Sequence, residues 1–136
     1  MSPEKIIFII SVFVVITSTL WLVYTRIPKR LKHDKFYDKW KKIQNKCSNK
    51  DSWKDAIIEA DNLVDEVLKK KKFKGNSMGE RLVNAEKTLG KHEAVWFGHK
   101  LRKKIENNPE TKLSKDDTKE ALLGFGQALK DLGALK

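Results

Sequence analysis

An uninterrupted apolar stretch near the N-terminus is the feature that most constrains this chain. Residues 6–25 contain no charged side chain, no proline and no glycine. As an α-helix this stretch would be about 30 Å long, which matches the hydrocarbon core of a bilayer. No other segment is apolar enough to surround such a helix inside a soluble core. The stretch therefore predicts a transmembrane helix at residues 6–25, after a short extracytoplasmic tail at residues 1–5.

A cleaved signal peptide is the alternative interpretation of the same stretch. A signal peptide would have a charged start, a shorter apolar region and a cleavage site made of small residues. Lys5 is the only basic side chain before the run, and no such site follows it. Trp21 and Tyr24 lie at its C-terminal end, and aromatic rings there are typical of a membrane interface. The sequence favours a retained anchor.

Basic residues follow the apolar stretch and give it a direction. Five of them come directly after it, opposed by a single aspartate: Arg26, Lys29, Arg30, Lys32 and Lys35. The positive-inside rule then predicts a single-pass protein of the plasma (inner) membrane, with its N-terminus outside and its C-terminal domain in the cytoplasm. The same five residues are candidate ligands for anionic lipid headgroups, although they could serve only as a topology signal. The whole chain carries a formal net charge of +11, which also favours anionic partners.

Apolar residues recur at helical spacing through the rest of the chain, and no useful length alternates as a β-strand would. A first helix, about Asp34 to Cys47, falls in a basic juxtamembrane linker at residues 26–50. Further helices are expected in a cytosolic domain at residues 51–136, with approximate limits of Ser52–Lys72, Ser77–Gly90, His92–Asn107 and Ser114–Gly133. The sequence thus predicts an all-α protein: a transmembrane helix followed by a small antiparallel bundle of four to five helices.

Local signals place several of these helix ends. A serine followed three residues later by an acid, a pattern that caps helix N-termini, occurs at Ser52, Ser77 and Ser114. The lysine run at residues 69–74 suits the negative end of a helix dipole, and we interpret it as a solvated helix end. Gly124 and Gly126 lower the helix propensity of the last helix and would allow another helix to approach it closely.

Few residues carry the pattern of a reactive site. The chain has no P-loop, no dinucleotide-binding glycine motif and no context for a serine or cysteine nucleophile. His92 and His99 share a helix face, but a metal ion would need further ligands, and Cys47 is the only cysteine. No metal site and no cofactor are predicted.

Arg102, with Leu101 as the alternative, falls on the inward-facing stripe of its helix, together with Trp96, His99 and Ile105. A cation on such a face needs an acidic partner, because burying an unpaired charge is costly. Four acidic residues on neighbouring helices are candidates for that partner: Asp61, Asp65, Glu66 and Glu80. This arrangement by itself indicates a structural ion pair between helices.

The residues around Arg102 also resemble a family motif. The segment Trp96-Phe97-Gly98-His99-Lys100-Leu101-Arg102-Lys103-Lys104-Ile105-Glu106-Asn107 is similar to the pattern W-x-x-H-x-[LI]-R-N-x-[IL]-x-H of the HEPN superfamily of small α-helical domains. Weaker likeness, to uncharacterised single-pass bacterial membrane proteins, extends the resemblance to about residues 53–135. Active HEPN proteins are metal-independent ribonucleases, in which the arginine and the next polar residue position the phosphate and the final histidine acts on the 2′-hydroxyl.

The resemblance implies a degenerate site at His99, Arg102, Lys103 and Asn107. Asn107 stands where the catalytic histidine is expected, and an amide cannot accept the proton. Lys103 replaces the usual asparagine, and His99 takes a supporting position. Phosphate binding could still survive through Arg102 and its lysine neighbours, because such contacts need only positive charge.

These observations leave several functions open. The first is a membrane-tethered, non-catalytic binding or scaffold module at the inner leaflet, whose partner is a protein, a second copy of the chain or anionic lipid. The alternative is a membrane-bound HEPN-like RNA-binding protein or ribonuclease. A third possibility is a small accessory subunit of a membrane complex. The loss of the catalytic histidine position favours a protein that is not an enzyme.

Overall fold

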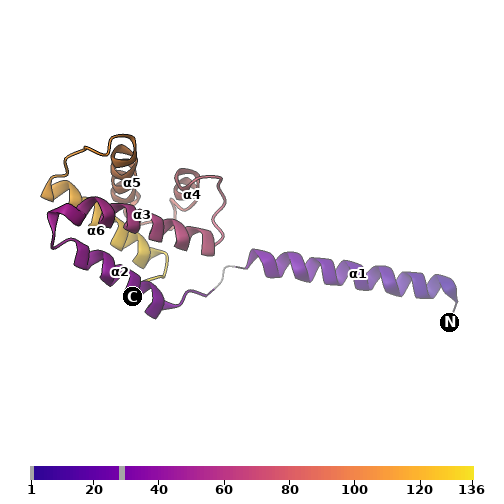
Figure 1. Ribbon diagram of the computed structural model, residues 1–136. Helices are drawn as coiled ribbons and strands as arrows, with labels where there is room; N and C mark the ends of the chain where they lie inside the picture. Colours follow the sequence, from indigo (N-terminus) through magenta and orange to yellow (C-terminus); the bar gives the residue numbers. More distant parts are fainter. Residues whose placement is uncertain (1, 28–29) are drawn as a thin grey trace.

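The computed structural model describes residues 2–27 and 30–136, and its regular elements there are all helices (Figure 1). In chain order these are α1 (Pro3–Arg26), α2 (His33–Lys46), the 3₁₀ turn η1 (Lys50–Ser52), α3 (Trp53–Lys70), α4 (Met78–Asn84), α5 (His92–Asn107) and α6 (Lys115–Asp131). The all-α prediction is confirmed for this part of the chain. Most helix limits lie within a few residues of those expected from the sequence.

Helix α1 extends away from the other helices and contributes no buried residue (Figure 1). It is long and apolar enough to cross a membrane, judged by length and composition alone. The helix begins at Pro3 and ends at Arg26, where Ile27 adopts extended φ and ψ angles of −71° and 124°. A residue before proline is driven to such angles, because the proline ring clashes with a helical neighbour. Pro28 itself lies with Lys29 outside the described residues.

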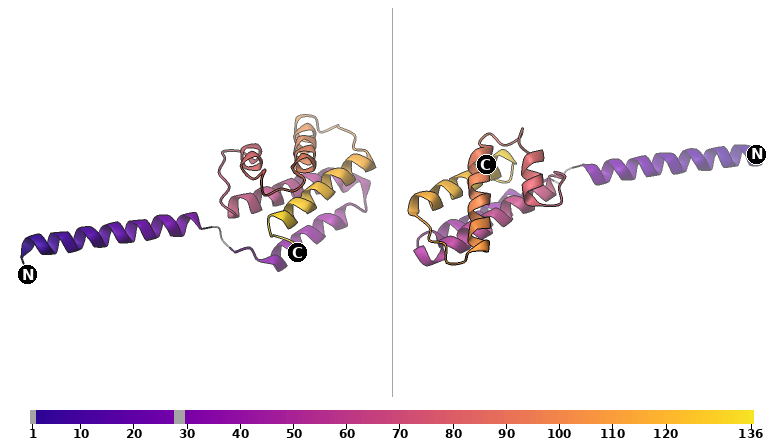
Figure 2. Two further views of the ribbon diagram at one scale, coloured as in Figure 1. Left: turned by 180° about the vertical axis from the view of Figure 1, so that it is seen from behind. Right: turned by 90° about the horizontal axis from the view of Figure 1, so that it is seen from above.

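Helix α3 is the centre of the remaining domain and contacts α2, α4, α5 and α6. Helices α2, α3 and α6 run broadly alongside one another, whereas α4 and α5 are seen nearly end-on in Figure 1 and cross them (Figure 2). The domain therefore differs from a simple antiparallel bundle. Because α3 is surrounded, any charged side chain on its inner faces must find a partner on a neighbouring helix.

The steep crossing of α5 over α6 depends on two glycines. A Cβ atom on Gly124 would lie 2.6 Å from the carbonyl oxygen of Ala94 in α5. A Cβ atom on Gly98 would lie 2.6 Å from the ring of Phe125 in α6. Both distances are far below van der Waals contact, so only glycine lets the two helices approach this closely. The close approach expected at Gly124 is thus present, with Ala94 as the facing residue.

One hydrophobic core joins α2–α6, and it starts earlier in the chain than residue 51. Leu31 is already buried, and α2 contributes Phe36, Trp40 and Ile43. These side chains follow helical spacing, so one face of α2 packs on α3 while its lysines remain outside. The segment that the sequence marked as a linker and first helix therefore supplies part of the folded domain.

The helix caps follow the sequence signals at two of three positions. The Ser77 and Ser114 hydroxyls accept hydrogen bonds from the backbone amides of Glu80 (3.2 Å) and Asp117 (3.0 Å). Ser52 makes no side-chain cap, because the 3₁₀ turn precedes α3 and Asn49 caps that turn instead. Helix α4 also ends at Asn84, and the chain continues to residue 88 in turns rather than as the longer helix expected to reach Gly90.

Candidate functional site

A carboxylate at the centre of the domain binds two side chains of α5, His99 and Arg102. Asp61 of α3 is fully buried, and its Oδ2 accepts a hydrogen bond of 2.8 Å from Arg102 Nη1. Its Oδ1 lies 2.9 Å from His99 Nδ1. His99 and Arg102 are three residues apart, so one face of α5 presents both to α3. Of the four candidate acidic partners for Arg102, Asp61 is the one that pairs with it.

The surroundings of this cluster hold both α5 side chains in place. Arg102 Nη2 also binds Glu106 Oε1 at 2.8 Å, one helical turn further along. Trp96 packs edge-on against His99, with 5.9 Å between ring centroids and 72° between ring planes. His99 Nε2 and Arg102 Nε are buried and have no hydrogen-bond partner among the described residues. The His99 side chain is therefore buried inside the domain, between Asp61 and Trp96.

Arg102 itself is less buried than its place in the stripe predicted. Its side chain is 22% exposed, because Leu101 takes the inward position and Arg102 reaches Asp61 from the rim of the helix. Two carboxylates, on Asp61 and Glu106, already neutralise its guanidinium. A phosphate group would have to compete with both, which makes Arg102 a poor anion ligand in this conformation.

A second ion pair was not anticipated from the sequence. Arg81 of α4 is buried and binds Asp65 of α3 through two nitrogens, at 2.6 and 3.0 Å. It also donates to the carbonyl oxygen of Gly75 at 2.8 Å, which fixes the loop before α4. Burial acts to raise the pKa of Asp65, but the hydrogen bonds and charge of Arg81 outweigh it and hold that pKa below its usual value. The spacing Met78, Arg81, Leu82 was the available signal, since it places the arginine on the buried face of α4.

The remaining residues of the candidate motif do not join the cluster. Lys103 and Asn107 are exposed, and Asn107 is the last residue of α5. His92 lies 3.6 Å from Glu86 rather than forming a pair with His99. Within the part of the chain that the structure describes, no group of three His, Cys, Asp or Glu side chains could hold a metal ion.

The predicted lipid-contacting residues lie at the junction of α1 and the domain. Arg26 ends α1, Arg30 and Lys32 precede α2, and Lys35 belongs to its first turn. All four of these side chains are exposed, whereas Lys29 lies outside the described residues. They therefore remain accessible to an external anion.

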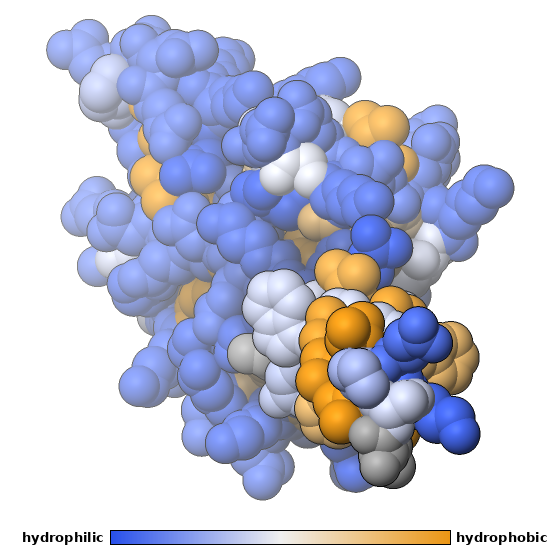
Figure 3. Space-filling model, turned by 90° about the vertical axis from the view of Figure 1, so that its right-hand side faces the viewer, coloured by the Kyte–Doolittle hydropathy of each residue, from blue (hydrophilic) through white to orange (hydrophobic). Residues whose placement is uncertain are grey.

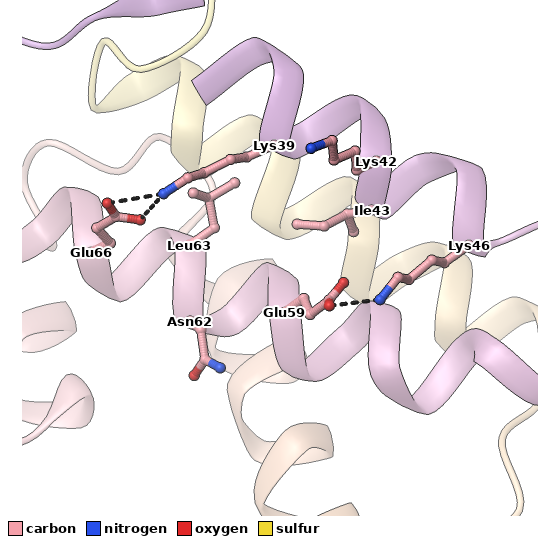
Figure 4. Close-up of a pocket in the computed structure, with 8 residues that line it drawn as sticks. All are labelled: Lys39, Lys42, Ile43, Lys46, Glu59, Asn62, Leu63 and Glu66. Carbon is pink, nitrogen blue, oxygen red and sulfur yellow. Dashed lines mark hydrogen bonds and ion pairs between the residues drawn. The ribbon is translucent and has the colours of Figure 1, made fainter. Parts of the chain in front are cut away.

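Further along α2, lysines form ion pairs across a shallow groove between α2 and α3 (Figure 4). Lys39 pairs with Glu66 at 3.0 Å and Lys46 pairs with Glu59 at 2.6 Å. The groove has a volume of about 340 Å³ and is lined at its base by Ile43 and Leu63. Lysines of α2 face glutamates of α3 across the groove, so these ion pairs help to hold α2 on α3.

No family model, no curated protein and no solved structure matches the chain. The likeness of residues 96–107 to the HEPN pattern, and the weaker likeness over residues 53–135, therefore stay a hypothesis. The hydrogen bonds of Asp61 to His99 and Arg102 do not depend on that hypothesis. They engage the two side chains of the motif that could otherwise contact a substrate.

Proposed function

We propose that α1 anchors this protein in a membrane and holds the helical domain at the cytoplasmic leaflet as a non-catalytic binding module. The observation that carries the proposal is the exposure of α1: its apolar side chains have no cover from the rest of the chain, and none of its residues is buried. An apolar surface this long is stable only when lipid or protein covers it. Lipid is the cover that its length fits.

The polar residues of α1 are compatible with a bilayer. Ser11, Thr17, Ser18 and Thr19 each donate a hydrogen bond to a backbone carbonyl three or four residues earlier in the same helix. An unsatisfied hydroxyl in hydrocarbon would cost several kcal/mol, so this internal bonding removes the main obstacle to insertion. With no Asp, Glu, Lys, Arg or His between Ile6 and Thr25, α1 has the character of a tether rather than of a transport path.

The orientation follows from charge on the two sides of α1. Glu4 and Lys5 precede the apolar run, whereas Arg26, Arg30 and Lys32 follow it within a few residues. The excess of positive charge on the domain side favours retention of that side in the cytoplasm. The helical domain would then act close to the inner leaflet.

The non-catalytic part of the proposal draws on the Asp61 network. In that network His99 is buried against Asp61 and Trp96, and Arg102 is shared between two carboxylates. Asn107, at the position of the expected histidine, has no side-chain group that can take a proton at neutral pH. These features support a degenerate HEPN-like domain that binds a partner without cleaving it.

The anchoring is tested by expressing the full chain with a C-terminal tag and washing the membranes with alkaline carbonate. We expect the tagged protein to stay in the membrane pellet, with an intact mass that includes residues 1–25. A variant with Val14→Arg and Val15→Arg should be extracted, because two charges at the helix centre cost several kcal/mol. A mature chain that begins after Tyr24 would instead identify a signal peptide and overturn the proposal.

The absence of catalysis is tested with the full chain in detergent and a panel of single-stranded RNAs at low salt, without added metal. We expect no cleavage by the unmodified protein. Cleavage that Arg102→Ala abolishes and Lys112→Ala leaves unchanged would contradict the proposal and favour the ribonuclease alternative. The Asn107→His variant restores the missing motif residue, so it shows whether the fold could support cleavage at all.

A further inference from the structure

Lysines from two segments far apart in the sequence meet at one end of the domain. Lys35 and Lys39 of α2 and Lys70 of α3 all place their ammonium groups around the Glu66 carboxylate. Their Nζ atoms lie 3.9, 3.0 and 3.7 Å from its oxygens. Three positive groups share one negative group, so the cluster keeps a surplus of positive charge. The sequence alone gave no reason to connect the lysines of residues 69–74 with those of α2.

The folded domain holds these like charges close together at some cost. Repulsion by Lys70, and then by Lys39, lowers the pKa of Lys35 from its ordinary value despite the attraction of Glu66. Lys70 and Lys39 also lie over the ring of Phe36, with Nζ at 5.1 and 5.9 Å from its centroid. Groups that repel one another in the free protein are relieved when an external anion binds between them. The cluster is therefore arranged to accept negative charge from outside.

The position of the cluster decides which anion can reach it. The end of α3 and the start of α2 both lie on the side of the domain from which α1 leaves (Figure 1). Figure 3 looks along α1 toward that side and shows a mainly hydrophilic surface around the apolar helix. Lys69, which also pairs with Asp65 at 3.4 Å, and Lys72 are exposed beyond Lys70 and extend the basic surface. If α1 spans a bilayer, this surface lies next to lipid headgroups.

We propose that this basic end of the domain, formed by Lys35, Lys39, Lys69, Lys70 and Lys72, docks on anionic phospholipid headgroups of the leaflet that α1 enters. The inference builds on the proposed anchoring by α1 and adds a second membrane contact, made by the folded domain itself. Docking fixes how the domain faces the membrane, and it leaves the α5 face and the far end of α6 free for a partner. The lysines after α3 thereby have a role beyond that of a solvated helix end.

The experiment uses the full chain in bilayer discs made either of phosphatidylcholine alone or of phosphatidylcholine and phosphatidylglycerol in equal parts. Two readouts separate the two claims. Brominated acyl chains report insertion of α1, because Trp21 is the one tryptophan of α1 and the part of the emission that they quench is compared with that of a Trp21→Phe variant. A fluorophore on Asn76→Cys, in a Cys47→Ser background, reports the distance of the loop after α3 from acceptor dyes on the headgroups.

We expect Trp21 to be quenched in both kinds of disc, and the fluorophore at residue 76 to approach the headgroups only when phosphatidylglycerol is present. Each basic residue near an anionic leaflet strengthens docking about fivefold, so a variant with Lys69→Gln, Lys70→Gln and Lys72→Gln should dock about a hundredfold less. The matched control, Lys112→Gln, Lys115→Gln and Lys119→Gln, loses the same charge at the opposite end of the domain. Its docking should stay within a few-fold of that of the unmodified protein.

The outcomes are distinguishable. Unquenched Trp21 would remove the anchoring itself, and the docking proposal with it. Quenched Trp21 with equal energy transfer in both lipids, or an equal loss in the two lysine variants, would overturn the docking alone. Energy transfer that responds to added single-stranded RNA but not to phosphatidylglycerol would assign the cluster to a nucleic acid and also overturn it.

Discussion

Replacing Asp61 tests whether the buried network really occupies the motif residues of α5. The Asp61 carboxylate is fully buried and serves Arg102 and His99 at once. The Asp61→Ala variant leaves His99 Nδ1 without its partner at a buried site, which costs about 1–3 kcal/mol. It also leaves a small cavity and frees one side of Arg102. Removing one partner of a buried charge pair typically costs about 3–5 kcal/mol in all.

The magnitude expected here lies at the lower end of that range. Arg102 is 22% exposed and keeps Glu106, so it can turn toward solvent instead of remaining buried and unpaired. We therefore expect Asp61→Ala to lower the free energy of unfolding by about 3 kcal/mol. Asp61→Asn should cost only about 1–2 kcal/mol, because its amide can bond both neighbours once the proton of His99 moves to Nε2.

Urea unfolding of the full chain in detergent micelles, followed by tryptophan fluorescence, measures both variants. Trp40, Trp53 and Trp96 all pack in or against the core, so the emission reports unfolding of the domain. Glu106→Gln is the control, because it removes the exposed carboxylate that Arg102 also binds and should cost less than about 0.5 kcal/mol. If Asp61→Ala costs no more than this control, the network does not hold Arg102 and His99, and both side chains would be free to act on a ligand.

Further predictions concern packing, pH and thiol reactivity. Gly124→Ala should destabilise the domain by about 1–2 kcal/mol in urea unfolding, because overpacking against Ala94 outweighs the gain in helix propensity. Gly79→Ala, where the nearest atom to the new Cβ is 3.6 Å away, should be neutral or stabilise by up to about 1 kcal/mol. The pKa of Asp65 is lowered in the folded state, so its contribution to stability is present above the unfolded value of 3.8 and is lost as the pH falls through the folded value. An Asp65→Asn variant should therefore show a smaller loss of stability between about pH 4 and pH 2. Burial raises the pKa of Cys47, so alkylation by iodoacetamide at neutral pH should be slow in the folded protein and rapid in urea.

Local signals predicted helix positions well because neighbouring residues determine them. The caps at Ser77 and Ser114 work as the sequence indicates, since a serine hydroxyl needs only an amide three residues ahead. Ser52 has the same pattern and fails. The chain enters α3 through a 3₁₀ turn, and Asn49 supplies the capping oxygen there. Two competing caps within four residues cannot be ranked without knowing how α2 packs on α3.

The sequence predicted that Arg102 forms an ion pair between helices, but it did not predict which acidic residue is the partner. A charge on a buried helix face must be paired, and this rule identified Arg102 and four acidic candidates. The choice of Asp61 depends on how α5 packs against α3, and this long-range contact is not encoded in the neighbouring residues of either helix. Asp61 also follows Ile57 by four residues, so its place on the buried face of α3 could have been recognised. The Arg81–Asp65 pair is a second example, because the sequence contains both residues but does not show that they lie close together.

The distribution of charge separates structural from functional residues in this protein. The buried ionisable side chains Asp61 and Arg81 have partners inside the domain, at distances of 2.6–3.0 Å. The lysines around Glu66 outnumber their acidic partner and remain accessible at the end of the domain nearest α1. A charged group that is already paired inside the domain attracts a ligand weakly, whereas an excess of one charge on the surface attracts ligands of opposite charge. A search for the partner of this protein should therefore begin at the basic end of the domain and not at the motif helix α5.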